Sequence, residues 1–243
     1  LFLALSQWSE TVCDGRFASQ LQTMQTKQTI AIIGSTGNMG SAIAKSLAKG
    51  NYRLLLKANK QEELEALVGE IQNTIPGADV EATACPKDAS WEADIIILAV
   101  PYSAEREIAE RIKEFANQKI VISIANPLNE TYNGLVTLPD TSAAEELQKL
   151  LPHAKVVKAF NTTFAADFSS PVIDGKQVDA FIAGNDEDAT STVAELVSTV
   201  GFNPIIAGNL SVSRTLENMQ LLLIQLGMKY NYNWLAGWKI LHN

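Results

Sequence analysis

The chain has 243 residues, 47% of them hydrophobic and 19% charged, which is the composition of one globular domain with a sizeable core. A formal net charge of −8 argues against nucleic acid or an anionic membrane as the main partner. Two cysteines without CxxC spacing and two histidines far apart in the sequence give no disulfide framework and predict no metal site.

The first 23 residues differ from the rest of the chain. Their apolar start ends after five residues and lacks a basic segment, so it is too short for a signal peptide and far short of the roughly 20 apolar residues of a membrane helix. Met24 stands directly before the first strand-like run, and we expect Met24 to be the natural start and residues 1–23 to be an extension outside the fold. The apolar run at 221–226 is also too short to span a bilayer, and we expect a soluble, cytoplasmic protein.

From Met24 on, short β-branched runs alternate with longer runs of helical periodicity. The predicted strands are residues 29–34, 52–57, 79–83, 93–100, 120–124, 154–160, 179–183 and 204–207. The predicted helices are residues 41–49, 61–72, 104–116, 142–151, 187–200 and 211–227. This alternation predicts a doubly wound α/β domain of the Rossmann type, with a mostly parallel sheet covered on both faces. We expect this domain to span residues 24–208, and a short helical extension to span residues 209–243.

A turn with three glycines follows the first predicted strand. Gly34, Gly37 and Gly40 have the spacing GxxGxxG between an apolar strand and an Ala-rich helix. Backbone N–H groups at such a helix start bind the diphosphate of a dinucleotide, and the glycines let the phosphates approach. We therefore expect a dinucleotide on this turn, against the alternative of a purely structural glycine turn. The candidate contacts are Gly34, Ser35, Thr36, Gly37, Asn38 and Met39.

The end of the second predicted strand favours NADP(H) over NAD(H). NAD-binding domains usually place Asp or Glu here to hold the ribose 2′-OH. This chain has Ala58, Asn59 and Lys60 instead, and the first acid is Glu62. A carboxylate repels a 2′-phosphate, while small polar and cationic groups receive it. Asn59 and Lys60 are the candidate contacts, with Lys57 as a further candidate, and the alternative is that the lysines only solvate a strand–helix corner.

Two later loops follow strands at the ligand side of a sheet of this kind. The residues of the two loops are Ala99, Val100 and Pro101 in the first, and Ala125, Asn126 and Pro127 in the second. Each proline stops its strand, so each loop taken alone also fits an ordinary strand-ending turn. We expect both loops to line the cofactor groove, with the Asn126 amide bonding the nicotinamide carboxamide or a substrate carbonyl.

No acid–base constellation is visible in the sequence, and we name no catalytic residue. Reduction of a carbonyl needs a proton donor, usually His, Tyr or Lys. His153 precedes the sixth predicted strand, at the edge opposite the groove, and Tyr102 lacks the lysine of a YxxxK motif because Arg106 stands there. Hydride exchange between two ring cofactors mainly needs alignment of carbons and exclusion of water. The sequence therefore favours a small-molecule redox acceptor of that kind.

The motifs together resemble the NADP oxidoreductases that depend on coenzyme F420, and the related reductase domain of the STEAP metalloreductases. The resemblance covers about residues 29–227 and rests on the glycine turn, Val100-Pro101, Asn126-Pro127 and the segments 156–162 and 183–189. It implies hydride transfer between NADP(H) and a flavin or a deazaflavin such as F420. It also implies that Phe160, Asn161 and Thr162 face the second ring system.

Two other functions stay open at this point. One is a non-catalytic NADPH-binding redox sensor, which needs no acid–base residue. The other is an NADPH-dependent imine or carbonyl reductase of the pyrroline-5-carboxylate reductase type, although such enzymes carry a longer helical domain than residues 209–243 allow. The apolar helix from Leu216 to Met228 is expected to belong to the core and to supply the surface of a homodimer, as are Tyr230, Tyr232, Trp234 and Trp238 after it. The alternative is that these residues stack on a substrate.

Overall fold

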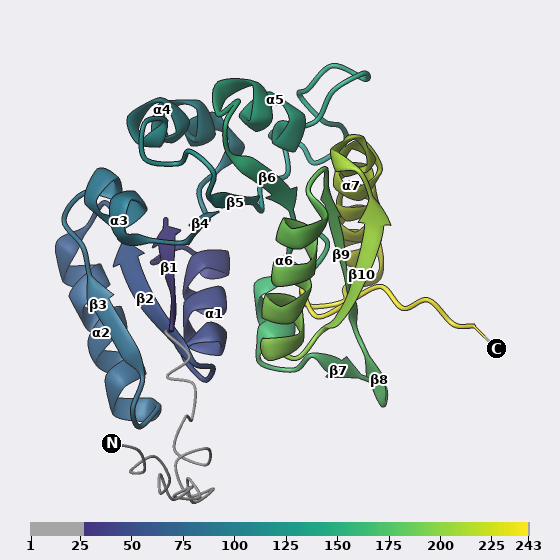
Figure 1. The fold of residues 1–243 in the computed structure, drawn as a ribbon. Coiled ribbons are helices and arrows are strands. Elements are labelled where there is room, and N and C mark those ends of the chain that lie inside the picture. Colours follow the sequence, from purple (N-terminus) through teal and green to yellow (C-terminus); the bar gives the residue numbers. More distant parts are fainter. Residues whose placement is uncertain (1–26, 243) are drawn as a thin grey trace, which may run out of the picture.

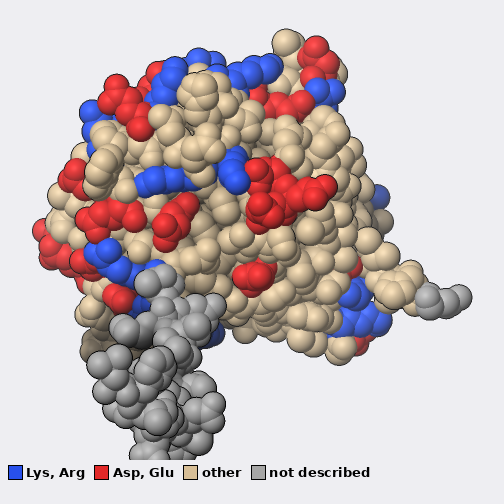
Figure 2. All heavy atoms as spheres, viewed as in Figure 1, with Lys and Arg blue, Asp and Glu red and all other residues tan. Residues whose placement is uncertain are grey.

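The computed structural model describes residues 27–242, shown as a ribbon in Figure 1. The extension expected over residues 1–23, and the start expected at Met24, lie outside the described residues. Residues 27–242 hold no helix that is both long and apolar enough to cross a membrane. Figure 2 shows acidic and basic side chains mixed over the viewed face, without a continuous basic band.

Eight strands of the described region form one sheet, in the order β10-β9-β6-β5-β4-β1-β2-β3. These strands are β1 (Gln28–Ile33), β2 (Tyr52–Lys57), β3 (Asp79–Ala82), β4 (Ile95–Leu98), β5 (Ile120–Ser123), β6 (Lys155–Lys158), β9 (Asp179–Gly184) and β10 (Asn203–Gly208). A separate hairpin pairs β7 (Val172–Ile173) with β8 (Lys176–Gln177). The strands β1 to β6 of the sheet run parallel, which confirms the mostly parallel α/β sheet predicted from the sequence.

The last two strands run against the other six. β9 pairs antiparallel with β6, and β10 pairs parallel with β9. A parallel return needs a crossover of a dozen residues or more, usually a helix. The chain between β6 and β9 holds only the short 3-10 helix η1 (Ala165–Phe168) and the β7–β8 hairpin, so it re-enters the sheet in the opposite direction. β9 therefore extends past the end of β6, beside the segment that follows it.

Helices cover both faces of the sheet, as a doubly wound fold requires (Figure 1). The helices are α1 (Asn38–Leu47), α2 (Gln61–Thr74), α3 (Pro86–Glu92), α4 (Tyr102–Ile112), α5 (Ala143–Leu150), α6 (Glu187–Thr199) and α7 (Ser213–Tyr230). Side chains of α1, α2 and α6 pack on one face, and those of α3, α4 and α5 pack on the other. The seven-residue α3 was not predicted, because so short a segment shows no helical periodicity.

The C-terminal helix α7 packs on the part of the sheet that holds the reversed strands. Its Leu216 contacts Phe181 of β9, and its Leu223 and Ile224 cluster with Phe164, which precedes η1. The short 3-10 helix η2 (Leu210–Val212) leads directly into α7. The boundary between two units at residue 208 stays a prediction.

The sheet order changes direction between β1 and β4. From β1 the chain builds outward to β2 and β3, and it then returns to place β4, β5 and β6 on the other side. In such sheets ligands bind in the crevice outside the carboxyl ends of the strands, at this switch point. The glycine turn, which directly follows β1, lies there.

Candidate active site

Two of the three glycines are required by the geometry of the turn. Gly34 has a φ of +91°, and a Cβ built on it would lie 2.2 Å from the carbonyl oxygen of Ala99. A Cβ on Gly40 would lie 2.2 Å from the carbonyl oxygen of Gly34. Because real Cβ atoms do not come so close to another atom, only glycine lets the turn pack on the end of β4 and lets α1 pack on the turn.

Gly37 differs from Gly34 and Gly40, because the fold has room for a side chain at this position. Its φ is −68°, and a Cβ would make an ordinary contact of 3.4 Å with the carbonyl oxygen of Gly34. Gly37 is the N-cap of α1, and no side chain of the described region caps this helix. The N–H groups of Asn38, Met39 and Gly40 have no carbonyl partner within the helix. The start of α1 is therefore open, and its unpaired donors and dipole favour an anion.

A cavity of about 480 Å³ lies on one side of this helix start; we call it the β2-side cavity. The predicted site residues in its lining are Gly34, Thr36, Gly37, Ala58, Asn59, Lys60, Ala99, Val100 and Pro101. The structure thus brings the glycine turn, the end of β2 and the loop after β4 around one volume. Arg111 of α4 also lines it and was missed, because nothing in the sequence places α4 beside the end of β2.

Lys60 lies at the rim of the β2-side cavity and is already paired. Its Nζ is 2.6 Å from Oε1 of Glu63, and its side chain is 75% exposed. The hydrogen bond from Lys60 to Glu63 raises the pKa of the lysine above its ordinary value. Because an exposed pair of this kind is weak, the ammonium is able to turn from Glu63 to an incoming anion.

A second cavity, of about 270 Å³, lies on the other side of the helix start; we call it the α7-side cavity. The predicted site residues in its lining are Asn38, Met39, Asn126, Phe160 and Asn161. Thr36 and Gly37 line the β2-side cavity, while the next two residues line this one, so the start of α1 lies between the two cavities. Among the lining residues outside the predicted set are Gln220 of α7 and Trp234, one of the aromatic residues beyond α7 for which substrate stacking was the alternative to the core.

Amide side chains give the α7-side cavity its polarity. Asn126 donates from Nδ2 to the carbonyl oxygen of Asn161 at 2.9 Å, and Asn161 donates from Nδ2 to Oδ1 of Asn126 at 2.9 Å. Within residues 27–242, Oδ1 of Asn161 and Oε1 of Gln220 are buried and have no hydrogen-bond partner. An unmet buried polar group costs free energy, so both amides would be stabilised by a water or a ligand that supplies an N–H or O–H donor.

The amide pairing changes the role expected of Asn126. Its amide group holds Asn161, and the oxygen that lacks a partner belongs to Asn161. Gln220 carried a signal that the prediction overlooked: it is a polar residue between Leu216 and Leu223 on the buried face of α7. A buried amide inside an apolar stripe needs a partner, and sequence alone does not say which.

The backbone that presents Asn161 is strained. Phe160 has a φ of +59°, in the left-handed region that non-glycine residues rarely adopt, and its side chain is fully buried. Its ring lies 5.8 Å from that of Phe168, centroid to centroid. Strain of this kind costs on the order of 1–3 kcal/mol and persists where the surrounding packing holds it, which is common at ligand sites.

Four predicted site residues do not line either cavity. Ser35 is buried and donates its hydroxyl to the carbonyl oxygen of Lys57 at 3.2 Å, so it fastens the turn to β2. Thr162 is fully buried, and its hydroxyl accepts from the N–H of Phe181 at 3.5 Å, so it turns towards β9. Ala125 and Pro127 are buried in the loop after β5. The expectation that Thr162 faces a second ring is not what this geometry favours.

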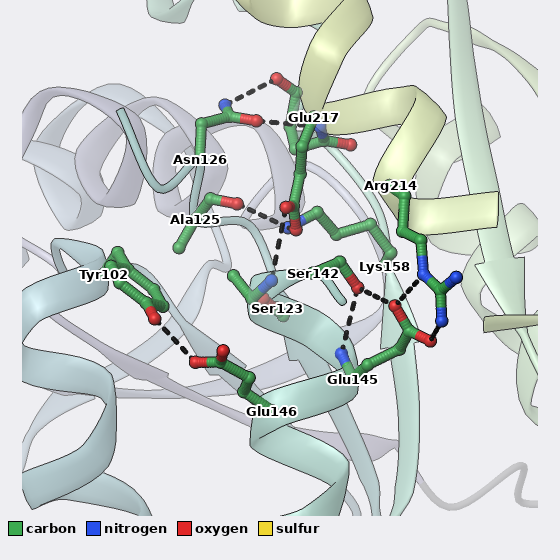
Figure 3. A network of polar contacts seen from close by, with 12 residues as sticks. Tyr102, Ser123, Ala125, Asn126, Ser142, Glu145, Glu146, Lys158, Arg214 and Glu217 are labelled. Carbon is green, nitrogen blue, oxygen red and sulfur yellow. Dashed lines mark hydrogen bonds and ion pairs between the residues drawn. The ribbon is translucent and has the colours of Figure 1, made fainter. Parts of the chain in front are cut away.

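A buried polar network lies beneath the loop after β5 (Figure 3). Lys158, at the end of β6, donates from Nζ to the carbonyl oxygen of Ala125 and to Oε1 of Glu217, the latter at 2.7 Å. Both charged side chains are 0% exposed. Glu217 also accepts from the N–H of Ala143 through Oε2 at 3.2 Å. The network therefore joins β6, the loop after β5, α5 and α7.

A second buried acid belongs to the same region. Glu105 of α4 accepts from the hydroxyl of Ser123 at 3.1 Å and is 3% exposed. Burial raises the pKa of Glu105 to about 7, although Lys158 and the Ser123 hydrogen bond oppose the shift. Tyr102, the nearest feature to a YxxxK motif, donates to Glu146 at 2.6 Å, and burial raises its pKa to about 12. Neither residue lines the α7-side cavity.

The residues that line the α7-side cavity are amides, aliphatic groups, aromatic rings and one hydroxyl. The hydroxyl is that of Thr163, and it donates to the carbonyl oxygen of Phe160 at 2.9 Å. The lining within residues 27–242 therefore holds no acid, base or thiol that titrates near neutral pH. His153 is exposed and precedes β6, at the end of the strands away from both cavities.

The comparison with known proteins agrees with this geometry. Residues 29–127 match the family model described as NADP oxidoreductase, coenzyme F420-dependent. The F420-dependent NADP reductase of Methanocaldococcus jannaschii is 35% identical over 212 residues, which cover 83% of this chain and 93% of that protein. The chain belongs to this family. The predicted family is thereby confirmed, and the chain is an NADP-dependent oxidoreductase.

Other relatives are consistent with the assignment. The crystal structure of a candidate F420-dependent NADP reductase from Arthrobacter sp. superposes with a TM-score of 0.74 at 25% identity, over 88% of this chain and 99% of that one. The metalloreductase STEAP3 of Rattus norvegicus is 25% identical over 198 residues, but these are only 37% of its length. An imine reductase of Streptomyces aurantiacus superposes with a TM-score of 0.62 at 17% identity, which shows a shared fold alone.

Proposed function

We propose that this family member transfers hydride between NADP(H) and a deazaflavin such as F420, or a related flavin. The observation that carries the proposal is the open start of α1 between two cavities, one of which holds two buried, unpaired amide oxygens. An extended dinucleotide has the same order of parts: an adenosine half, a diphosphate and a nicotinamide half. The F420-dependent NADP reductases among its relatives support the choice of acceptor.

The residues of the β2-side cavity fit the adenosine half of NADP(H). Gly37 leaves room for the diphosphate, whose oxygens would accept from the N–H groups of Asn38 and Met39. Asn59 and Lys60 lie at the end of β2 and would receive the 2′-phosphate, with Lys60 leaving Glu63 to do so. Lys57 and Arg111 are further cations on the same lining. These roles are part of the proposal.

The α7-side cavity fits the nicotinamide half. When bound there, the dinucleotide supplies the ring carbon that gives or takes the hydride. The carboxamide of the nicotinamide has two N–H donors, and Asn161 and Gln220 offer the two oxygens that lack one. Phe160, Phe164 and Ile224 would exclude water from the reacting face.

The chemistry of the lining favours a ring acceptor over a carbonyl or an imine. Hydride addition to a carbonyl leaves an alkoxide, which needs a proton donor in reach. The described lining offers none, because its hydroxyl already donates to a backbone carbonyl. Hydride addition to a deazaflavin or flavin leaves a charge spread over the conjugated ring, so alignment and water exclusion suffice. A non-catalytic sensor is the remaining alternative.

The proposal is tested by measuring NADPH oxidation with F420, FMN, ferric chelates and a panel of carbonyls and imines. We expect turnover with F420 or a flavin and none with carbonyls or imines. Turnover with a carbonyl or imine alone would overturn the choice of acceptor. Tight NADPH binding without turnover by any acceptor would favour the sensor.

Assembly and location are also proposals. A homodimer is supported by the exposed apolar side chains at the end of α7 and beyond it, which are Met228, Tyr230, Tyr232, Trp234 and Leu235. Light scattering of the purified protein would measure its mass, and a monomer at micromolar concentration would contradict the dimer. A cytoplasmic location stays a prediction.

A further inference from the structure

One buried ammonium group lies where the segments that carry the cavity amides meet. Nζ of Lys158 contacts the carbonyl oxygen of Ala125 and the carboxylate of Glu217, and Figure 3 shows it between the loop after β5 and α7. Each residue of this cluster is followed closely by an amide of the α7-side cavity. Asn126 comes directly after Ala125, Asn161 comes three residues after Lys158, and Gln220 comes three residues after Glu217.

Burying the charges of Lys158 and Glu217 costs free energy, so the presence of the pair calls for a reason. Two charges are taken fully out of water, and replacing such a pair by apolar side chains is often neutral or stabilising. Stability alone therefore does not explain the pair. What this pair adds over apolar packing is a link between specific points, because the ammonium donates to the Ala125 carbonyl oxygen and to Glu217 at the same time.

The geometry points to Lys158 and Glu217 as positioning residues that hold Asn126, Asn161 and Gln220 in the arrangement that recognises the nicotinamide carboxamide. This inference rests on the proposed function, since it assumes that the nicotinamide half enters the α7-side cavity. Lys158 holds the backbone next to Asn126, and Asn126 in turn holds Asn161. Glu217 fixes the turn of α7 that presents Gln220, and its second oxygen is held by the N–H of Ala143.

The test compares NADP⁺ with its 3-acetylpyridine analogue, in which a methyl group replaces the carboxamide NH₂. The analogue supplies no N–H to the two unpaired oxygens, so the protein should bind it about tenfold or more weakly than NADP⁺. Calorimetry measures both affinities without any turnover. In Glu217→Gln and Lys158→Met we expect NADP⁺ to bind more weakly, while the affinity for the analogue changes little. The affinity ratio, which is the affinity for NADP⁺ divided by that for the analogue, therefore falls towards one.

A fold control accompanies each variant. Binding of 2′-phospho-ADP-ribose, which has no nicotinamide, should stay unchanged, because it uses only the β2-side cavity. If Lys158→Met fails to fold, the double variant Lys158→Met/Glu217→Leu is used in its place, because it leaves no unpaired buried charge. The matched control is Arg214→Gln, which removes the bidentate pair of Arg214 with Glu145 (2.6 and 2.8 Å) that also ties α7 to α5.

The outcomes separate positioning from attachment of the helix. The inference is supported if the affinity ratio falls in the Lys158 and Glu217 variants and stays at the value of the unaltered protein in Arg214→Gln. An unchanged ratio in the Glu217 and Lys158 variants overturns it, and so does an equal fall in Arg214→Gln, because either result leaves only a structural role. Equal binding of NADP⁺ and the analogue by the unaltered protein would overturn it as well. Failure of the proposed function would instead appear as an absence of NADPH oxidation with every ring acceptor.

Discussion

Replacement of Glu105 by glutamine should remove a pH dependence of stability that the buried network creates. Glu105 is 3% exposed, and burial raises its pKa from an ordinary 4.5 to about 7. The folded state therefore holds this proton more tightly than the unfolded state. Its contribution to stability is fully present below pH 4.5 and is lost as the pH rises through about 7.

The size of the effect follows from the two pKa values. At 1.36 kcal/mol per pKa unit, the difference amounts to about 3 kcal/mol between acid and alkaline conditions. Glutamine keeps the size of the side chain and its hydrogen bond to Ser123 but does not ionise. Relative to the unaltered protein, Glu105→Gln should therefore gain about 2.5 kcal/mol in free energy of unfolding between about pH 5 and about pH 8, which is most of this difference.

Urea unfolding of both proteins across this pH range measures the difference. Burial also raises the pKa of Asp167 to about 7, but Asp167 is present in both proteins, so its contribution cancels in the comparison. Glu110→Gln, on the exposed face of the same helix, is the control and should leave the pH dependence unchanged. Parallel curves for Glu105→Gln and the unaltered protein would refute the reasoning.

Three further predictions concern the two cavities. Gly37→Ala should leave the melting temperature nearly unchanged and weaken NADP⁺ about tenfold or more, because its Cβ fits the fold but occupies the diphosphate position; calorimetry showing full affinity would contradict this. Gly34→Ala should instead abolish the soluble folded protein, since its Cβ would meet the Ala99 carbonyl oxygen at 2.2 Å, and a normal circular dichroism melt would contradict that. Lys60→Glu should weaken NADPH far more than NADH, and equal loss for both would show that Lys60 does not contact the 2′-phosphate.

The local part of this site could be predicted from the sequence. The apolar strand, the glycine spacing and the following helix are contiguous, so about 15 residues determine their geometry. The start of α1, the end of β2 and the loop after β4 were expected together because parallel strands end at one edge. The lining of the β2-side cavity agrees with that expectation for nine of the predicted positions, Arg111 being an addition.

The other cavity depends on contacts between distant residues. The pair of Lys158 and Glu217 spans 59 residues, and Gln220 enters the site only because α7 packs back over the loop after β5. Sequence periodicity places Gln220 on the buried face of its helix but not against Asn161. The position of Thr162 depends on distant residues too: the reversed β9 runs beside residues 160–162, and the N–H of Phe181 donates to the Thr162 hydroxyl.

The most direct test of the account is the transfer of the hydrogen itself. NADPH carrying deuterium at one of the two C4 positions would be mixed with F420 and the purified protein, and the reduced acceptor analysed by mass spectrometry. The account predicts that deuterium from one C4 position, and not from the other, appears on the ring of the acceptor, because a nicotinamide held in the α7-side cavity as proposed would present a single face. Reduced F420 that carries no deuterium from either position, or no reduction at all, would contradict direct hydride transfer at this site.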